Sequence, residues 1–272
     1  MSKWNTEHTT GSPRIAIDHT GSGPFVLFTH GIGGNRTNWH DQLPVFGENF
    51  HAASWDARGY GASDDYDGPL DFADFSRDLV RVLDHFHSAK AHLVGLSMGG
   101  LIAFDFHATH PERVATLTIC DSMPGMSGLS DEGRREFIRI RQEPLLSGKE
   151  PRDIAPIVAQ TLVGKSAQPG SFERLVASMS ALHKDSYLKT IVATTNYARK
   201  LELENIRVPT HIVVGDEDTL TPPAMSRAMA SRIPGARLSI IRGAGHLSNI
   251  EQPAAFNAAT LPFLLEHRAA TA

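Results

Sequence analysis

The sequence has one cysteine, Cys120, among its 272 residues. A single cysteine excludes an internal disulfide bond. Cys120 follows the apolar run of residues 115–119, a place typical of a small buried side chain rather than of a nucleophile. The fold therefore depends on an ordinary hydrophobic core, and a chain of this length with 41% hydrophobic residues can form one.

Long apolar runs are also lacking. No stretch approaches the roughly 18 consecutive apolar residues of a membrane-spanning helix, and residues 1–5 do not start an apolar signal sequence. These absences predict a soluble cytoplasmic protein with no membrane partner.

Neither sign of charge dominates, because 26 Lys and Arg stand against 30 Asp and Glu, for a net charge of −4. This balance gives no reason to expect nucleic acid as a partner. Histidines such as His85 and His87 have no acidic or cysteine neighbours in a metal-binding pattern. The composition predicts no metal, a small-molecule partner, and a monomer or small homo-oligomer.

One glycine-rich turn carries the strongest sign of chemistry. Residues 95–100 read Gly-Leu-Ser-Met-Gly-Gly, between an apolar run at 91–94 and a helical pattern that begins at Leu101. Strand, Gly-x-Ser-x-Gly and helix in this order predict a tight turn that exposes the Ser97 hydroxyl at a helix N-terminus. The alternative is a glycine-rich turn with an incidental serine.

A second glycine-rich loop follows the apolar run of residues 25–29. It reads His30-Gly31-Ile32-Gly33-Gly34, and acyl transfer needs backbone N–H groups aimed at a developing oxyanion. We expect the amides of Ile32 and Met98 to be these donors, with His30 orienting the loop. A plain strand-to-helix loop is the alternative.

The order of the remaining elements predicts an α/β fold. Residues 14–19 alternate weakly between apolar and polar, and further strands are predicted at 51–56, 114–120, 210–214 and 237–241. Helical periods cover 72–86, 223–231 and 253–266. Residues 131–200 show only helical periods, at 132–142, 151–162, 171–182 and 187–197. We expect a core domain of residues 1–125 and 201–272, and a helical cap of residues 126–200 over the strand ends.

A serine hydroxyl becomes a good nucleophile only when a base removes its proton. A histidine that acts as this base needs a carboxylate to fix its tautomer. The chain offers Ser97, Asp218 and His246, each just past a different strand. Asp216 and Asp121 are rivals for the acid, with turn stabilisation and loop hydrogen bonding as their alternative roles. Asp56 and Arg58 are expected to form a structural pair.

These motifs together resemble the capped, cofactor-free α/β-hydrolases, from about Arg14 onward. The resemblance rests on the serine turn, on His30-Gly31-Ile32, on Gly215-x-x-Asp218-x-x-x-Pro222 and on Gly243-Ala244-Gly245-His246. It implies a mostly parallel, doubly wound sheet with the cap inserted after the sixth strand. It also favours Asp218 over its rivals, and it implies no cofactor.

Within that family, the serine turn and the run Gly-Ala-Gly-His-Leu-Ser-Asn-Ile-Glu-Gln-Pro look most like 3-oxoadipate enol-lactonases, which hydrolyse a small anionic lactone. Carbon–carbon bond hydrolases usually have Asn where Leu96 stands, and epoxide hydrolases and haloalkane dehalogenases use aspartate where Ser97 stands. Three alternatives stay open. They are a carbon–carbon bond hydrolase, against which Leu96 counts, a cofactor-free haloperoxidase-like perhydrolase, and a ligand receptor such as the strigolactone receptors.

The hypothesis is therefore a serine hydrolase that cleaves a carboxylic ester or lactone through an acyl-enzyme. Most charges of the cap are expected on solvated helix faces. One or two of four cap arginines are candidates to point inward instead and hold a substrate carboxylate; they are Arg134, Arg135, Arg139 and Arg141. The residues expected to contact the substrate are Gly31, Trp39, Leu96, Met123, Arg135, Leu220 and Leu247.

Overall fold

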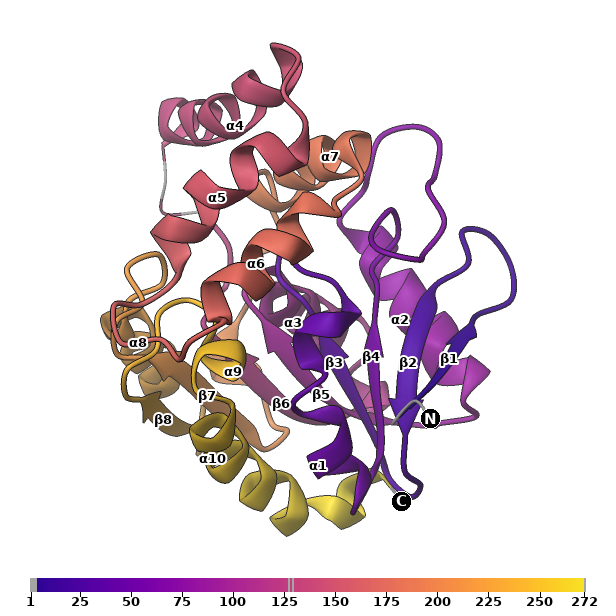
Figure 1. The fold of residues 1–272 in the computed structure, drawn as a ribbon. Coiled ribbons are helices and arrows are strands. Elements are labelled where there is room, and N and C mark those ends of the chain that lie inside the picture. The colour runs from indigo at the N-terminus through magenta and orange to yellow at the C-terminus, as the bar shows by residue number, and fades with distance from the viewer. Residues whose placement is uncertain (1–3, 127, 129, 272) are drawn as a thin grey trace.

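An eight-stranded sheet forms the centre of the protein, and the computed structural model describes residues 4–126, 128 and 130–271. The strand order is β1-β2-β4-β3-β5-β6-β7-β8 (Figure 1). The strands are β1 Asn5–His8, β2 Ala16–Thr20, β3 Phe25–Thr29, β4 His51–Trp55, β5 Ala91–Leu96, β6 Val114–Cys120, β7 Thr210–Gly215 and β8 Arg237–Ile241. β2 pairs antiparallel with β1 and β4, and all other pairs are parallel.

The sequence pattern predicts β6 and β8 residue for residue but does not predict β1. All four residues of β1 are exposed at the edge of the sheet, so the strand carries no apolar alternation. When β1 is counted, β6 is the sixth strand, so the helices that follow β6 are inserted after the sixth strand, as the resemblance implies.

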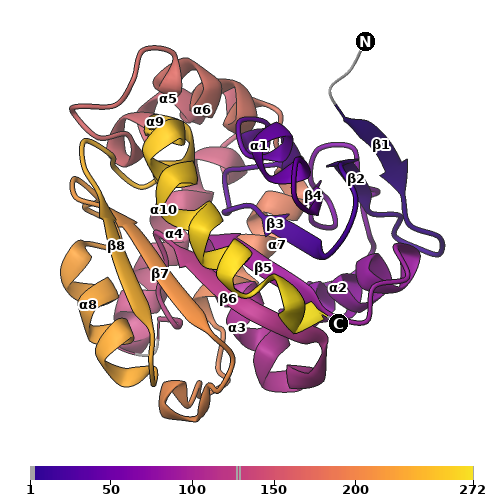
Figure 2. The same cartoon turned by 90° about the horizontal axis from the view of Figure 1, so that it is seen from below.

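Helices cover both faces of the sheet, which confirms the doubly wound arrangement (Figure 2). One face is covered by α1 Leu43–Gly47 and α10 Pro253–Glu266, and the other by α2 Ala73–His85, α3 Met98–Thr109 and α8 Pro223–Arg232. Short pieces complete the chain: α9 Ser248–Glu251 and 3-10 turns at Arg36–Trp39, Pro111–Arg113, Leu203–Asn205 and Arg268–Thr271. No helix in the described part combines the length and apolarity that crossing a bilayer requires.

The core forms where apolar stripes meet the sheet. On α2, the buried side chains of Phe75, Leu79, Val82 and Leu83 recur at helical spacing. Each such side chain contributes about 1.5–3 kcal/mol by its burial. Cys120 is fully buried with a free thiol, as expected for a core residue.

Four helices lie between β6 and β7. They are α4 Asp131–Leu146, α5 Pro151–Leu162, α6 Ser171–Ser180 and α7 Lys184–Thr195, and no strand interrupts the described residues of this segment. They cover the end of the sheet at which β5 turns into α3 (Figure 1). The division into a core domain and a cap of residues 126–200 stays a prediction, and residues 1–3, 127, 129 and 272 lie outside the described residues.

The expected pairing of Asp56 with Arg58 is wrong. Asp56 is fully buried and accepts hydrogen bonds from the backbone N–H and the guanidinium of Arg36. Arg58 turns the other way, with its Nε 2.7 Å from Asp78 Oδ2 and its Nη1 3.2 Å from Asp74 Oδ1. The two side chains therefore pair with different residues, Asp56 with Arg36 and Arg58 with the aspartates of α2.

Candidate active site

Ser97 lies on a strained turn between β5 and α3. Its backbone has φ 53° and ψ −117°, a conformation that side chains with a Cβ rarely adopt. The turn closes only because its neighbours lack side chains. A Cβ on Gly95 would lie 2.3 Å from the Gly99 carbonyl oxygen, and one on Gly99 would lie 2.2 Å from the Thr29 carbonyl oxygen. The two glycines therefore allow the hydroxyl of Ser97 to stand clear of the sheet.

Three side chains from distant parts of the chain meet at this turn. The Ser97 Oγ lies 2.9 Å from His246 Nε2, and His246 Nδ1 lies 2.9 Å from Asp218 Oδ2. A carboxylate beside Nδ1 holds the proton on that nitrogen, so Nε2 is left to accept the serine proton. The structure thus brings together the serine, histidine and acid that the sequence predicts.

Charges around His246 favour its protonated form. Burial alone would lower the pKa of this histidine, but the hydrogen bond and charge of Asp218, with the charges of Asp121 and Glu251, raise it overall. Burial likewise opposes ionisation of Asp218, and hydrogen bonds from His246 and Thr221 lower the pKa of Asp218 overall. The pair is arranged to stabilise an imidazolium as it forms.

The loop after β3 lies against the serine turn. A Cβ on Gly31 would lie 3.1 Å from the Ser97 Cβ, so no side chain separates the two backbones. In the described part of the chain, neither the Ile32 amide nor the Met98 amide donates a hydrogen bond to protein. Both N–H groups are thus available to an oxyanion.

His30 fixes this loop, as expected. Its Nδ1 donates to the Gly31 carbonyl oxygen at 2.7 Å, and its Nε2 accepts from the Ala57 amide at 3.0 Å. Burial lowers the pKa of His30, which keeps the ring neutral. The ring therefore positions the Gly31 backbone and is not free to transfer protons.

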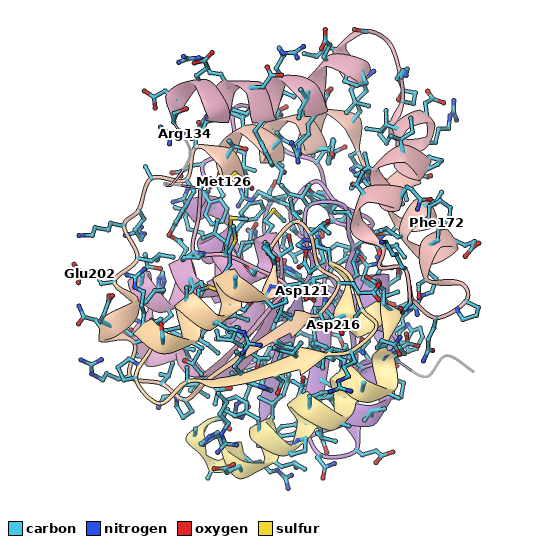
Figure 3. All side chains as sticks on the ribbon, turned by 90° about the vertical axis from the view of Figure 1, so that its left-hand side faces the viewer. Asp121, Met126, Arg134, Phe172, Glu202 and Asp216 are labelled. Carbon is cyan, nitrogen blue, oxygen red and sulfur yellow. The ribbon has the colours of Figure 1, made fainter. Side chains whose placement is uncertain are left out.

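The rival acids have other partners. Asp216 accepts a hydrogen bond from the Gly243 amide at 2.7 Å and is exposed. Asp121 is fully buried, accepts from the Gly215 amide at 2.8 Å, and accepts from the Ser248 hydroxyl at 2.5 Å. Figure 3 shows both aspartates at the sheet end beneath the inserted helices. Their contacts agree with the turn-stabilising and loop-bonding roles.

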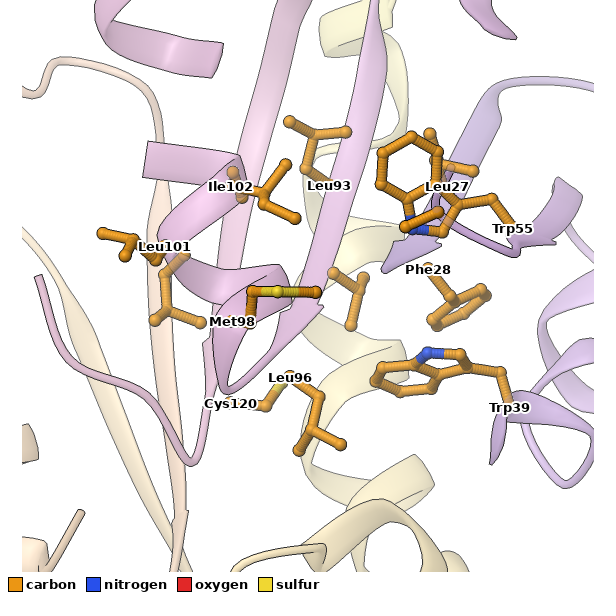
Figure 4. Packing of buried hydrophobic residues seen from close by; sticks show 14 of the residues in the cluster. Leu27, Phe28, Trp39, Trp55, Leu93, Leu96, Met98, Leu101, Ile102 and Cys120 are labelled. Carbon is orange, nitrogen blue, oxygen red and sulfur yellow. The ribbon is translucent and has the colours of Figure 1, made fainter. Parts of the chain in front are cut away.

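Trp39 does not line the site, and the expectation that it contacts substrate is wrong. Its side chain is fully buried, with ring centroids 4.9 Å from Phe28 and 6.0 Å from Phe256. Figure 4 shows Trp39 among the core side chains, with Leu96 and Met98. The Asn35 side chain caps the 3-10 turn of Arg36–Trp39 and so aims the tryptophan inward.

The expectation that Arg135 faces inward is also wrong, because its side chain is exposed on α4. Met123 and Leu220 are half-buried and Leu247 is buried. Contact of these three residues and of Leu96 with substrate stays a prediction.

The other arginines of α4 differ in their partners. Arg134 pairs with Asp131, and Arg139 pairs with Glu136 and Glu143. Arg141 is half-buried, lies 3.3 Å from the Phe137 ring centroid and donates to the Phe137 carbonyl oxygen at 3.2 Å. Within residues 4–126, 128 and 130–271, it has no carboxylate partner.

Sequence reasoning missed the residues through which the inserted helices reach the site. A Cβ on Gly33 would lie 3.1 Å from Met179 Cγ, and Ser178 Oγ donates to the Gly33 carbonyl oxygen at 3.0 Å. Helix α6 therefore covers the loop that carries Ile32. No motif marks these residues, since only the folded chain places them beside the loop.

The same described residues contain no group of three or more His, Cys, Asp or Glu side chains arranged to hold a metal ion. The polar groups around Ser97 are instead engaged with one another. Ser122 Oγ, for example, donates to the Ser97 carbonyl oxygen at 2.6 Å.

Comparison with known proteins agrees with this geometry. The chain is 24% identical over 268 residues to 3-oxoadipate enol-lactonase 2 of Acinetobacter baylyi, covering 94% of this chain and 96% of that protein. It is 29% identical over 266 residues to RutD of Azorhizobium caulinodans, which is named as a carbamate hydrolase, covering 93% of this chain and 96% of that protein.

A thermophilic esterase from Thermogutta terrifontis, solved with malate bound, superposes with a TM-score of 0.87 at 27% identity, covering 98% of this chain and all (100%) of that chain. The relatives together support a hydrolase. Residues 24–253 match the family described as the alpha/beta hydrolase fold, so the chain belongs to that family.

Proposed function

We propose that the protein is a serine hydrolase that cleaves a carboxylic ester or lactone through an acyl-enzyme on Ser97. The observation that carries the proposal is the 2.9 Å contact between Ser97 Oγ and His246 Nε2, with Asp218 on the far side of the imidazole. The relatives named as an enol-lactonase and an esterase support the same reaction class.

The first step is acylation. Ser97 Oγ attacks the substrate carbonyl while His246 Nε2 takes its proton, and the Ile32 and Met98 amides hold the oxyanion. The tetrahedral intermediate collapses as His246 gives its proton to the leaving alkoxide. For a lactone, that alkoxide stays attached to the acyl group.

The second step is hydrolysis of the acyl-enzyme. His246 removes a proton from water, the resulting hydroxide attacks the acyl carbon, and the same two amides hold the second oxyanion. Return of the proton to Ser97 Oγ releases the carboxylic acid. The ionised Asp218 keeps the imidazole in one tautomer through both steps and takes no proton itself.

The finer part of the proposal is a small anionic lactone as substrate. The relative named 3-oxoadipate enol-lactonase supports it. Arg141 takes the place of Arg135 as the candidate for the substrate carboxylate, because its half-buried guanidinium has no acidic partner among the described residues.

The test begins with covalent labelling. A fluorophosphonate should modify Ser97 of the wild-type protein, as read by peptide mass spectrometry, and Ser97→Ala should abolish both labelling and hydrolysis while leaving the circular dichroism spectrum unchanged. Removal of the nucleophile is expected to lower kcat by a factor on the order of 10⁶. Hydrolysis that survives in purified Ser97→Ala would refute the proposal.

A substrate panel then separates the alternatives. It contains lactones with and without a carboxylate, aryl esters, a carbamate, and acetate with peroxide. We expect the highest kcat/KM for an anionic lactone. A carbamate is the second candidate, because one relative is named as a carbamate hydrolase. Preference for acetate and peroxide would favour a perhydrolase instead, and binding without turnover would favour a receptor.

A further inference from the structure

Glu251 is a buried carboxylate outside the serine, histidine and aspartate cluster. Its side chain is fully buried at the end of α9, five residues after His246. Among the described residues it forms no ion pair with Lys, Arg or His. A carboxylate in such a place needs hydrogen-bond donors, since burial without them costs several kcal/mol.

Three backbone amides supply those donors. Glu251 Oε2 accepts from the Gly245 amide at 2.8 Å and from the Gly164 amide at 2.8 Å, and Oε1 accepts from the Leu247 amide at 2.9 Å. Gly245 and Leu247 are the two neighbours of His246. Gly164 lies just after α5, and we call residues 162–168, which run from the last residue of α5 toward α6, the cap segment.

The His246 amide completes the pattern. It donates to the Leu162 carbonyl oxygen of the cap segment at 2.8 Å. The two backbones are in close contact, because a Cβ on Gly245 would lie 2.4 Å from the Gly164 nitrogen. All three amides of residues 245–247 are thus bound by Glu251 or by the cap segment.

We propose that Glu251 is a positioning residue that sets the backbone carrying His246 and ties it to the cap segment. The inference rests on the proposed serine hydrolase function. Glu251 touches neither the substrate nor the reacting atoms. It acts through the histidine loop (residues 243–247), whose position determines whether His246 Nε2 stays within reach of Ser97 Oγ.

The isosteric change Glu251→Gln tests this proposal because an amide has only one acceptor. The glutamine oxygen can take the place of Oε2 and accept from two amides, but its NH₂ group then faces the Leu247 amide, donor to donor. The backbone beside His246 has to move, and the negative charge near the imidazole is lost.

The expected result is a fall in kcat of about 10- to 100-fold, the cost of misplacing a catalytic group by about 1 Å. KM stays near its wild-type value, and the rate of Ser97 labelling by a fluorophosphonate falls with kcat. The acid limb of the kcat/KM profile moves to lower pH, because Glu251 favours protonated His246. Glu251→Asp keeps the charge but is too short to reach all three amides, so kcat falls and the acid limb stays in place.

Glu217→Gln is the matched control. Glu217 also binds the cap segment, accepting from the Ser166 amide at 3.0 Å and its hydroxyl at 2.5 Å, but it does not bind the amides beside His246. We expect this variant to keep the wild-type kcat and pH profile. An equal loss in Glu217→Gln would assign the effect to cap anchoring and overturn the inference.

The outcomes separate the inference from the proposed function. If wild-type protein is not labelled at Ser97, the proposed function fails. If it is labelled and Glu251→Gln matches it in kcat, labelling rate and pH profile, only the positioning role of Glu251 fails. If Glu251→Gln does not fold, Glu251→Asp decides, since a wild-type kcat in that variant would also overturn the inference.

Discussion

The sheet and the four inserted helices differ in how they are stabilised. The sheet buries its large side chains completely, Trp55 and Phe28 among them. The inserted helices leave large apolar side chains in solvent, with Leu146 69% exposed and Ile157 66% exposed. They contact the core through both apolar and polar side chains, with Met179 and Ile191 buried in the hydrophobic cluster and Ser178 Oγ donating to the Gly33 carbonyl oxygen at 3.0 Å.

This difference separates two tasks. Chemistry needs atoms held within a few tenths of an ångström, and the densely packed sheet ends supply that rigidity. Substrate choice needs a surface that can differ between relatives, and we expect the inserted helices, with their more exposed surface, to supply it. The comparison predicts large effects on turnover in the core and smaller, substrate-dependent effects in the inserted helices.

After the loss expected for Ser97→Ala, the largest effect is expected within one loop of the core, where two aspartates can be compared. Asp218 Oδ1 accepts from the Leu220 and Thr221 amides at 2.8 and 2.9 Å, so an asparagine would keep its oxygen there and turn its NH₂ toward His246. The histidine would then hold the wrong tautomer, and Asp218→Asn should lower kcat by about 10⁴-fold. Asp216→Asn, two residues away, should stay within about threefold of wild type, since its partner is the Gly243 amide. Steady-state kinetics on both variants measures the contrast, and a loss under tenfold in Asp218→Asn would contradict the assignment.

The second prediction compares the stability cost of a substitution in the core with that of a substitution in the inserted helices. Trp39→Ala should lower the free energy of unfolding by about 3–5 kcal/mol, because the indole packs against Phe28 and Phe256. Ile157→Ala, at an exposed position on α5, should change it by no more than about 0.5 kcal/mol. Urea unfolding followed by tryptophan fluorescence or circular dichroism gives both values. Equal losses would show that the two regions are stabilised alike.

The core was largely predictable because burial leaves a strong pattern. The mostly apolar and β-branched run of residues 114–120 predicts β6 with its observed ends, and glycines at 95 and 99 mark a turn that sterics allow to no other residue. Strand β1 was not predictable, because an exposed edge strand carries no apolar signal. The order of Ser97, Asp218 and His246 indicated a shared site, but only the sheet order places them together.

The direction of single side chains was less predictable. Trp39 was expected to contact substrate, yet it ends a 3-10 turn and its side chain is buried in the core. Arg135 and Arg141 share a helix, and a difference of six positions puts one in solvent and the other half-buried. The sequence predicted no role for Glu251, although it lies in the histidine motif, because its partner Gly164 lies 87 residues away in sequence.

The third prediction concerns pH and the carboxylates that surround His246. Only neutral His246 can accept the serine proton, so kcat/KM should fall as pH drops through the pKa of this histidine, which its environment raises above the ordinary value of 6.5. Asp121 contributes to that rise, and burial beside Asp218 raises the pKa of Asp121 itself to about 7. Asp121→Asn should therefore move the acid limb to lower pH by less than about one unit. Asp216→Asn is the control, and an acid limb that moves upward in Asp121→Asn would contradict the electrostatic account.

The smallest expected effect lies in the inserted helices and depends on the substrate. Arg141 and Arg139 stand two residues apart on α4, but Arg139 is engaged by Glu136 and Glu143 at the surface. Among the residues that the structure describes, Arg141 contacts only the ring and the carbonyl oxygen of Phe137. A guanidinium that is half-buried without a carboxylate partner can gain a charge-assisted hydrogen bond from an anionic substrate, a contact of about 1.5–3 kcal/mol when buried and less when solvent shares it. Arg141→Met should therefore raise KM for a lactone that carries a carboxylate by about 3- to 10-fold, leave KM for a neutral ester of similar size unchanged, and leave kcat for both unchanged. Arg139→Met should change neither KM.

The contradicting outcome is an equal rise in KM for both substrates in Arg141→Met. Arg141 would then shape the inserted helices rather than recognise charge. The substrate carboxylate would have to be bound by the core, and the two regions would no longer have separate tasks.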